Sequence, residues 1–129
     1  MPVPAHSGMQ AADTKRAIAF YNDLFGWSFT RWEGRMDYWL IKTGDKDTLG
    51  IDGGLLPRQG PPPAPMQSVN GYVCTIGVDN LDAMIKKIGE LGTKIVVPKM
   101  AIPSVGWLTY ANDTEGNIFG MMQSDTSAK

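Results

Sequence analysis

Cysteine, histidine and long apolar runs are scarce in this sequence, and each scarcity excludes a class of protein. Among 129 residues there is one cysteine, so no internal disulfide can form, and a reducing compartment is expected. No apolar stretch approaches the roughly 20 residues that a membrane-spanning helix needs. The opening MPVPAHSGMQ lacks the basic region and apolar run of a secretion signal. We therefore expect a cytoplasmic, globular domain without a membrane partner.

An excess of one charge sign is also missing. The chain has 12 basic and 13 acidic residues, with no run of either sign. Nucleic acids and anionic membranes bind concentrated Lys and Arg, so neither is an expected partner. The single histidine, His6, means that the chain alone cannot build an iron site from two histidines and one carboxylate.

What the sequence does contain is one pattern used twice. Residues 13–27 carry apolar residues at the spacing of a helix with one buried face, at Ala17, Phe20, Tyr21 and Leu24. Asp13 or Thr14 can cap the start of this helix, and Gly26 can close its end. Residues 79–92 repeat the pattern, with Asp79 and Gly92 each 66 positions after its counterpart.

A second anchor repeats at the same offset. The sequences Asp47-Thr48-Leu49-Gly50 and Asp113-Thr114-Glu115-Gly116 each lie between a β-rich run and the next strand. Asp favours the first position of a tight turn, and Gly supplies the positive φ that closes it. Two independent anchors at one offset indicate a duplication.

The short β-rich runs around each predicted helix complete the organisation. We predict one α+β domain, 1–129, built from tandem βαβββ modules that form a curved mixed sheet with an open cleft. The modules are 1–56 and 70–124, joined by a proline-rich linker, 57–69; a peptide-docking motif is the alternative reading of this linker. Within the third strand, alternation puts Tyr38 and Leu40 on one face and Trp39 on the other. The polar end SDTSAK is expected to be loose.

Four stretches resemble the vicinal-oxygen-chelate superfamily, which includes glyoxalase I, bleomycin-resistance proteins and extradiol dioxygenases. They are His6 with the following Asp13, then RAIAFYNDLFGW, GVDNLDAM and DTEGNIFGMM. The resemblance covers nearly the whole chain and implies paired βαβββ modules whose curled sheets form a cleft, often completed in a homodimer. We therefore expect a homodimer. These stretches are structural signatures, so they indicate fold more strongly than activity.

The resemblance also locates four positions at which metal-dependent members hold their ion. These members place one ligand on the first and one on the fourth strand of each module. The repeat transfers the positions to His6 and Gly54, and to Gly120 with either Tyr72 or Val73. Only His6 is a good donor to a divalent metal. No metal cofactor is therefore expected, and a divalent metal held through His6 is the alternative.

Strand alternation assigns further residues to the candidate cleft. Asp52 should share the face of Gly54, where it could act with His6 as a general base or weak metal ligand, or cap a glycine turn. Trp39 and Trp107 belong either to the cleft wall or to the core, and Tyr38 or Tyr110 can add aromatic surface. The predicted ligand-binding residues are Gln10, Trp39, Gly54, Tyr72, Trp107, Gly120 and Met122.

Three functions remain open on this basis. The favoured one is a metal-independent protein of the glyoxalase/bleomycin-resistance type that binds a small, partly aromatic or apolar molecule. The alternative is a lyase or isomerase that uses His6, with Asp52 and a weakly held divalent metal. The third is a stress or regulatory module whose interface is the functional surface.

Overall fold

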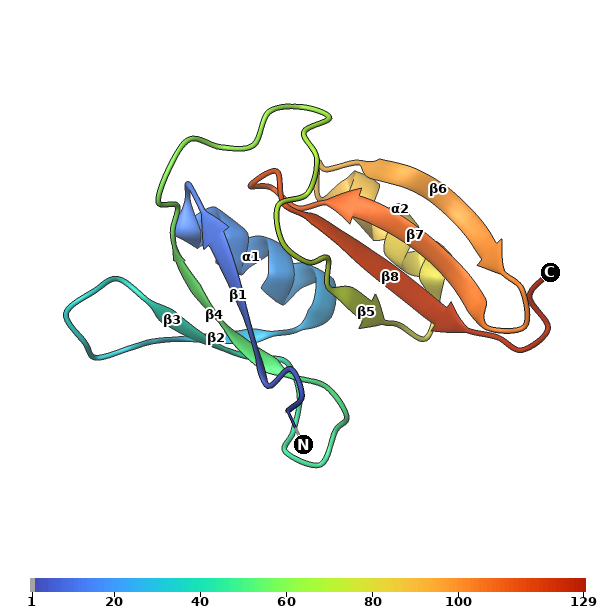
Figure 1. The fold of residues 1–129 in the computed structure, drawn as a ribbon, viewed down its shortest axis with the longest axis horizontal. Helices are drawn as coiled ribbons and strands as arrows, with labels where there is room; N and C mark the ends of the chain where they lie inside the picture. Colours follow the sequence, from blue (N-terminus) through green and yellow to red (C-terminus); the bar gives the residue numbers. More distant parts are fainter. Residues whose placement is uncertain (1) are drawn as a thin grey trace. The chain divides into compact units, whose positions relative to one another are not determined.

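The computed structural model describes residues 2–129, which divide into two compact units. Unit 1 is Met1–Pro62 and unit 2 is Pro63–Lys129, so the boundary falls inside the proline-rich segment 57–69. Each unit contains one helix and four strands in the order strand, helix, strand, strand, strand (Figure 1). The predicted α+β fold of tandem βαβββ modules is confirmed.

Unit 1 consists of five elements around one mixed sheet. They are β1 (His6–Ala11), α1 (Thr14–Phe25), β2 (Ser28–Arg31), β3 (Trp39–Lys42) and β4 (Asp52–Pro57). The strand order is β1-β4-β3-β2; β1 runs parallel to β4, whereas β3 is antiparallel to both of its neighbours. The strand that opens the unit therefore pairs with the strand that closes it.

Unit 2 has the same topology, as the repeat predicts. Its elements are β5 (Thr75–Gly77), α2 (Leu81–Glu90), β6 (Ile95–Ile102), β7 (Gly106–Asn112) and β8 (Ile118–Ser124). The order is β5-β8-β7-β6, with β5 parallel to β8 and the other pairs antiparallel. Helix α2 packs against β7 and β8, along one face of the sheet (Figure 1).

Helix α1 begins and ends where the sequence predicts. The side chain of Asp13 accepts a hydrogen bond from the backbone N–H of Arg16 at 3.1 Å, and Gly26 closes the helix in the left-handed conformation at φ 75°. The predicted apolar face is buried: Ala17, Phe20, Tyr21 and Leu24. Burying a large apolar side chain contributes about 1.5–3 kcal/mol, so this face ties α1 to unit 1.

Helix α2 departs from the predicted repeat by one residue. Its N-cap is Asn80, whose side chain accepts from the N–H of Ala83 at 3.0 Å, and not Asp79. Asn80 follows Asp13 by 67 positions, whereas Gly92 follows Gly26 by 66. The second module is therefore one residue shorter between the N-cap of its helix and the following glycine. Residues before α2 correspond to residues of the first module 67 positions earlier, and not 66.

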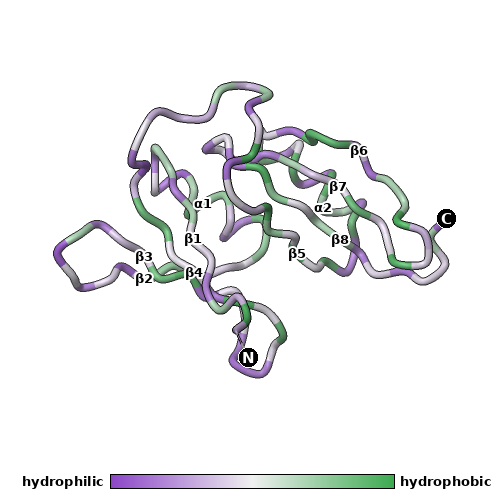
Figure 2. Tube along the Cα trace, viewed as in Figure 1, coloured by the Kyte–Doolittle hydropathy of each residue, from purple (hydrophilic) through white to green (hydrophobic). Residues whose placement is uncertain are grey.

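The core of unit 1 lies between α1 and one face of its sheet. A buried cluster of Ala11, Ala17, Ile41 and Leu55 is surrounded by half-buried Met9, Ile18, Trp27, Phe29 and Trp39. Because α1 is the one helix among the described residues of unit 1, the opposite face of this sheet is not covered by a helix of the unit. The tips of the loops that join β2 to β3 and β3 to β4 are hydrophilic (Figure 2).

The Asp-Thr-x-Gly turns have the predicted conformation. Gly50 and Gly116 both adopt positive φ, at 143° and 82°. In the second turn, the Asp113 carboxylate accepts hydrogen bonds from the backbone N–H groups of Glu115 and Asn117, at 2.8 and 2.9 Å. The DTEGN signature is therefore accounted for by turn geometry.

The C-terminal segment is ordered, contrary to the expectation of a loose tail. Ala128 is buried, and its carbonyl accepts a hydrogen bond from the N–H of Ser104 at 3.0 Å. The carboxylate of Asp125 accepts from the indole N–H of Trp107 at 3.0 Å. These contacts fold the polar end back onto unit 2, which its composition alone does not reveal.

Candidate functional site

The sheet face of unit 1 that turns away from α1 carries four of the predicted site residues, namely His6, Gln10, Asp52 and Gly54. We call it the open face and define it by His6, Gly8, Gln10, Tyr38, Leu40, Asp52 and Gly54. The register supports this grouping, because His6 lies opposite Asp52, and Gly54 lies between Gly8 on one side and Leu40 on the other. Side chains at paired positions project from the same face of a sheet.

A hydrogen bond between His6 and Tyr38 crosses this face. The two groups, the imidazole Nε2 and the phenol hydroxyl, are 3.0 Å apart, although β4 separates β1 from β3. The hydroxyl and ring edge of Tyr38 occupy the space that a Cβ at Gly54 would need. The tyrosine therefore fills the space over Gly54, to which the resemblance assigns the fourth-strand ligand. Sequence reasoning did not foresee this contact.

Open space remains beside this pair, over Gly8. A Cβ added at Gly8 would have no heavy atom within 4 Å. Along β1 the flanking residues on the same face are His6 and Gln10. Nearby apolar surface is exposed, because the Leu40 side chain is 47 % exposed in the middle of the sheet. The open space over Gly8 thus adjoins both a polar pair and apolar surface. Sequence reasoning did not single out Gly8, because a glycine in a strand carries no chemical signal of its own.

Trp32 extends the apolar surface around Tyr38. It is 44 % exposed, and its ring meets the Tyr38 ring edge-on, with centroids 6.2 Å apart. The backbone N–H of Trp32 donates to the carbonyl of Tyr38 at 2.8 Å, which continues the β2–β3 ladder by one step. Aromatic surface next to a hydroxyl is a common composition of small-molecule sites.

Asp52 and Gln10 lie on the open face but are engaged in local structure. The Asp52 Oδ1 accepts from the Thr43 backbone N–H at 2.9 Å and from its hydroxyl at 3.3 Å, which fixes the start of the 43–52 loop. The Gln10 Oε1 accepts from the backbone N–H of Gln59 at 3.0 Å and so holds the chain that leaves β4. Of the roles expected for Asp52, these contacts support the capping of a turn and not a general base or metal ligand.

The two tryptophans lie on the helix-facing sides of their sheets. Trp39 is paired with Leu55 and packs against the unit 1 core, so it faces away from His6. Trp107 is paired with Gln123, whose side-chain oxygen accepts from the N–H of Leu81 at the start of α2. Both tryptophans therefore belong to the helix-facing side of their sheets, and the expectation that they line the cleft is wrong.

In unit 2, Gly120 is covered by neighbouring side chains. A Cβ there would meet the Thr75 hydroxyl at 3.0 Å and the Tyr110 ring at 3.1 Å. Met122 lies on the same face and is half-buried. On this face the open position is Gly77, opposite Met122, where an added Cβ would have no heavy atom within 4 Å.

The register also decides which residue corresponds to His6. Gly8 pairs with Gly54 in unit 1, and Thr75 pairs with Gly120 in unit 2. The residue two positions before Thr75 is Val73, so Val73 and not Tyr72 is the counterpart of His6. Tyr72 precedes β5 and is fully exposed.

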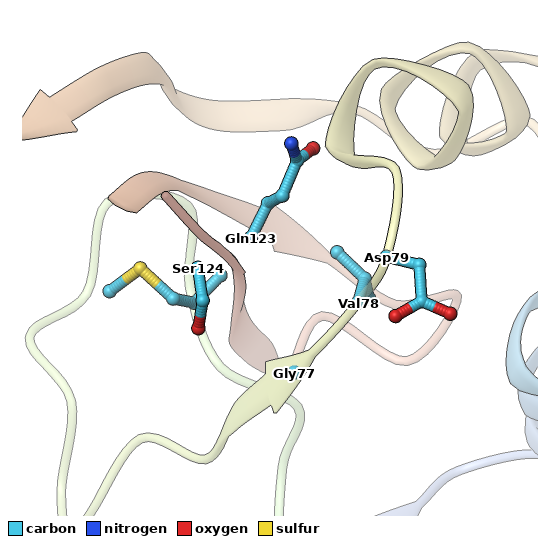
Figure 3. A pocket seen from close by; sticks show the side chains of 6 residues that line it. Gly77, Val78, Asp79, Gln123 and Ser124 are labelled. Atoms are coloured by element: carbon cyan, nitrogen blue, oxygen red, sulfur yellow. The ribbon is translucent and has the colours of Figure 1, made fainter. Parts of the chain in front are cut away.

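A shallow surface pocket lies at the ends of β5 and β8. It has a volume of about 280 Å³ and is lined by Gly77, Val78, Asp79, Met122, Gln123 and Ser124. Figure 3 shows Gln123 turned toward the first turn of α2, with Val78 and Asp79 on the segment that leads into this helix. Met122 is the one predicted site residue that lines it, so this pocket does not gather the candidate set.

The donor set does not fit the superfamily's metal position. Across residues 2–129, no group of three or more His, Cys, Asp or Glu side chains is placed to hold a metal ion. His6 supplies a nitrogen donor, but Val73 and the two glycines supply none, and the Tyr38 hydroxyl lies over Gly54. No reaction step through a metal follows from these residues.

Comparisons with known proteins agree with this fold. Residues 4–121 match the model of the Glyoxalase/Bleomycin resistance protein/Dioxygenase superfamily. Two curated relatives, from Mycobacterium bovis and Mycobacterium tuberculosis, are each named "Putative glyoxylase CFP32" and are 25% identical over 119 residues. The match covers 91% of this chain and 44% of theirs, so the chain spans less than half the length of these relatives. Over residues 2–129, neither helix is long and apolar enough to cross a membrane.

Solved structures with the same fold include proteins of antibiotic resistance. A glyoxylase/bleomycin resistance protein/dioxygenase domain from Frankia sp. EAN1pec aligns with TM-score 0.74 at 14% identity, covering 97% of this chain and 99% of that one. The fosfomycin resistance protein FosX from Listeria monocytogenes gives 0.72 at 12%, covering 97% and 95%. The antibiotic binding protein TnmS3 from Streptomyces sp. CB03234 gives 0.67 at 19%, covering 97% and 98%. Together with the family match over nearly its whole length, this fold identifies the chain as a member of the glyoxalase/bleomycin resistance protein/dioxygenase superfamily.

Proposed function

We propose that the protein binds a small, partly aromatic or apolar organic molecule on the open face of unit 1, without a metal at the superfamily's ligand positions. The observation that carries this proposal is the space over Gly8, which adjoins the His6–Tyr38 hydrogen bond and the exposed Leu40 side chain. Small-molecule sites combine apolar walls with a few fixed polar groups. This face offers both.

Two further observations support the proposal. Leu40 and Trp32 stay about half exposed on one face, although apolar side chains of this size gain stability when they are covered. Similar folds belong to TnmS3, which is described as an antibiotic binding protein, and to the fosfomycin resistance protein FosX. A bound organic molecule would cover the exposed residues on the open face.

The alternative function is a lyase or isomerase that uses His6 with a divalent metal. A structure of Listeria FosX was solved with Mn(II) and a dihydroxypropylphosphonic acid, so such an ion belongs to the superfamily's repertoire. Elemental analysis of protein purified without chelator separates the two functions. A content near one Zn, Ni, Mn or Fe per chain that is lost in His6→Ala would favour the enzyme and contradict the binding protein.

Native mass spectrometry of the purified protein tests the binding function. We expect an added mass of a few hundred daltons on a fraction of the chains, a size typical of small organic ligands. Gly8→Val should abolish this adduct, because its side chain fills the space over Gly8. Gly77→Val is the matched control, since a Cβ at Gly77 also has no neighbour within 4 Å but lies in β5 of unit 2. Equal adducts in both variants would contradict the location.

We also propose that the protein acts as a homodimer. Strand β1 ends its sheet, and its sequence HSGMQA has neither the proline nor the lysine that usually protects an edge strand. Light scattering coupled to size-exclusion chromatography tests this directly. A mass of one chain at all protein concentrations would contradict it.

A further inference from the structure

We infer that Tyr38 selects the ligand, and that the ligand class is a planar aromatic molecule with a hydroxyl or carbonyl oxygen. The inference rests on the proposed function and adds to it the polar group that replaces a metal. Tyr38 would hold the oxygen of the ligand through its own hydroxyl, oriented by His6. Tyr38 is thus a specificity-determining residue that the metal-ligand pattern of the superfamily does not include.

The position of the hydroxyl is the first step of this argument. It lies over Gly54, 3.0 Å from the imidazole Nε2 of His6, and next to the open space over Gly8. A ligand atom in that space can approach the hydroxyl without displacing another side chain. A hydrogen bond to His6 restrains the tyrosine, so its oxygen is held at one place before the ligand arrives.

The hydrogen-bonding capacity of the pair sets the chemistry of the ligand. A tyrosine hydroxyl has one donor and also accepts, and a neutral imidazole has one donor and one acceptor. If His6 Nε2 accepts, the Tyr38 oxygen is left to accept from a ligand hydroxyl. If Nε2 carries the proton and donates, the Tyr38 O–H is left to donate to a ligand hydroxyl or carbonyl. A hydroxyl therefore fits both tautomers, and a carbonyl fits one.

The surroundings of the hydroxyl favour a flat apolar body. The Tyr38 ring, Trp32 beside it and Leu40 on β3 present apolar surface, with Trp32 and Leu40 about half exposed. Aromatic rings prefer edge-to-face or offset contacts, which the exposed Trp32 ring and the half-buried Tyr38 ring can make with a planar ligand. The carboxylate of Asp52 on this face already caps its loop by accepting from the Thr43 backbone N–H.

Binding of two matched probes, β-naphthol and naphthalene, tests the inference. They share a planar body and differ in one hydroxyl, and each is titrated while the amide signals of Gly8 and Leu40 are followed by NMR. A net hydrogen bond corresponds to roughly a three- to tenfold change in affinity. We expect wild type to prefer β-naphthol by that factor. Tyr38→Phe should reduce the preference to near one without weakening naphthalene. It should remain folded but unfold a few degrees below wild type, because it loses the hydrogen bond to His6.

Tyr72→Phe is the control, because Tyr72 is fully exposed outside the sheet, and it should keep the preference. The imidazole of His6 gives a second readout, since it is the single histidine of the chain and its nitrogen signals need no assignment. These signals should shift with β-naphthol in wild type and not in Tyr38→Phe. If Tyr38→Phe retains the preference, Tyr38 is not the selecting residue, while the binding function stands. If neither probe binds wild type, the proposed function fails together with the inference.

Discussion

The hydroxyl of Tyr38 lies 3.0 Å from Nε2 of His6. His6 begins β1 and Tyr38 immediately precedes β3, and β4 lies between these two strands in the sheet. Gly54 makes this contact possible, because any side chain there would occupy the position of the hydroxyl. Gly54 therefore supplies no side-chain donor and leaves room for the Tyr38 hydroxyl. The predictions below test this arrangement and the repeat that located it.

Gly54→Ala should break the His6–Tyr38 hydrogen bond while unit 1 stays folded. The new Cβ would collide with the end of the Tyr38 side chain, which can rotate toward solvent. The free energy of unfolding should fall by about 1 kcal/mol, the scale of one lost hydrogen bond. Urea denaturation monitored by tryptophan fluorescence measures the change.

The same substitution in a Tyr38→Ala background is the control for that prediction. Once the ring is absent, the three atoms nearest to the added methyl are gone. Gly54→Ala should then change the stability by only a few tenths of a kcal/mol, within the range of a surface substitution. An equal loss in both backgrounds would show that the collision with Tyr38 is not the cause.

Asn80→Ala should destabilise unit 2 by about 1 kcal/mol, the usual loss for an N-cap. Asp79→Ala should change the stability by less than about 0.5 kcal/mol, because the Asp79 side chain does not cap α2. Thermal or urea unfolding of the two variants compares them directly. If Asp79→Ala lowers the stability more than Asn80→Ala does, Asp79 is the N-cap. The 66-residue offset would then hold at the start of α2 and would favour Tyr72 as the counterpart of His6.

The element order, the helix faces and both turns could be predicted because they depend on residues close together in sequence. The periodicity of Phe20, Tyr21 and Leu24 reports a buried helix face without knowledge of what covers it. Alternation likewise separated Tyr38 and Leu40 from Trp39. A capping residue before the helix and a glycine after it mark where the helix of each module begins and ends.

The site could be predicted only in part, because it depends on how distant strands pair. Alternation does not say which side of β3 meets α1; that follows from the pairing of Trp39 with Leu55. The diagonal reach of Tyr38 over Gly54 also depends on this register. A difference of one residue between the N-cap of α2 and Gly92 has no local signal, so the choice between Tyr72 and Val73 needed the pairing of Thr75 with Gly120.

Asp125 should make unit 2 less stable in acid. Hydrogen bonds from the Ser127 hydroxyl, the Trp107 indole and the Ser127 backbone N–H lower the pKa of Asp125 below its ordinary value of 3.8. Because the folded pKa is lower than the unfolded one, this stabilisation is complete above the unfolded pKa and is lost as the pH falls through the folded pKa. Asp125→Asn should therefore flatten the decline in stability below about pH 4.

Urea unfolding at a series of acidic pH values measures that difference, and the indole N–H signal of Trp107 reports the contact itself. If wild type and Asp125→Asn decline with the same slope below about pH 4, the lowered pKa of Asp125 does not contribute.

Two glycines near the end of α2 should respond to alanine in opposite directions. A Cβ at Gly89 has no neighbour within 4 Å, so Gly89→Ala should stabilise the helix by about 0.5 kcal/mol. Gly92 has φ 81°, which alanine adopts only with strain, so Gly92→Ala should destabilise by about 1 kcal/mol. Calorimetric melting temperatures measure both, and equal shifts would contradict the assigned helix end.

The location of ligand binding is tested most directly by an amide chemical-shift map of the 15N-labelled protein at saturating β-naphthol. The open-face site predicts the largest shifts at Gly8, Leu40 and Gly54. Largest shifts at Gly77, Val78 and Asp79, or no saturable shift at any amide, would contradict it.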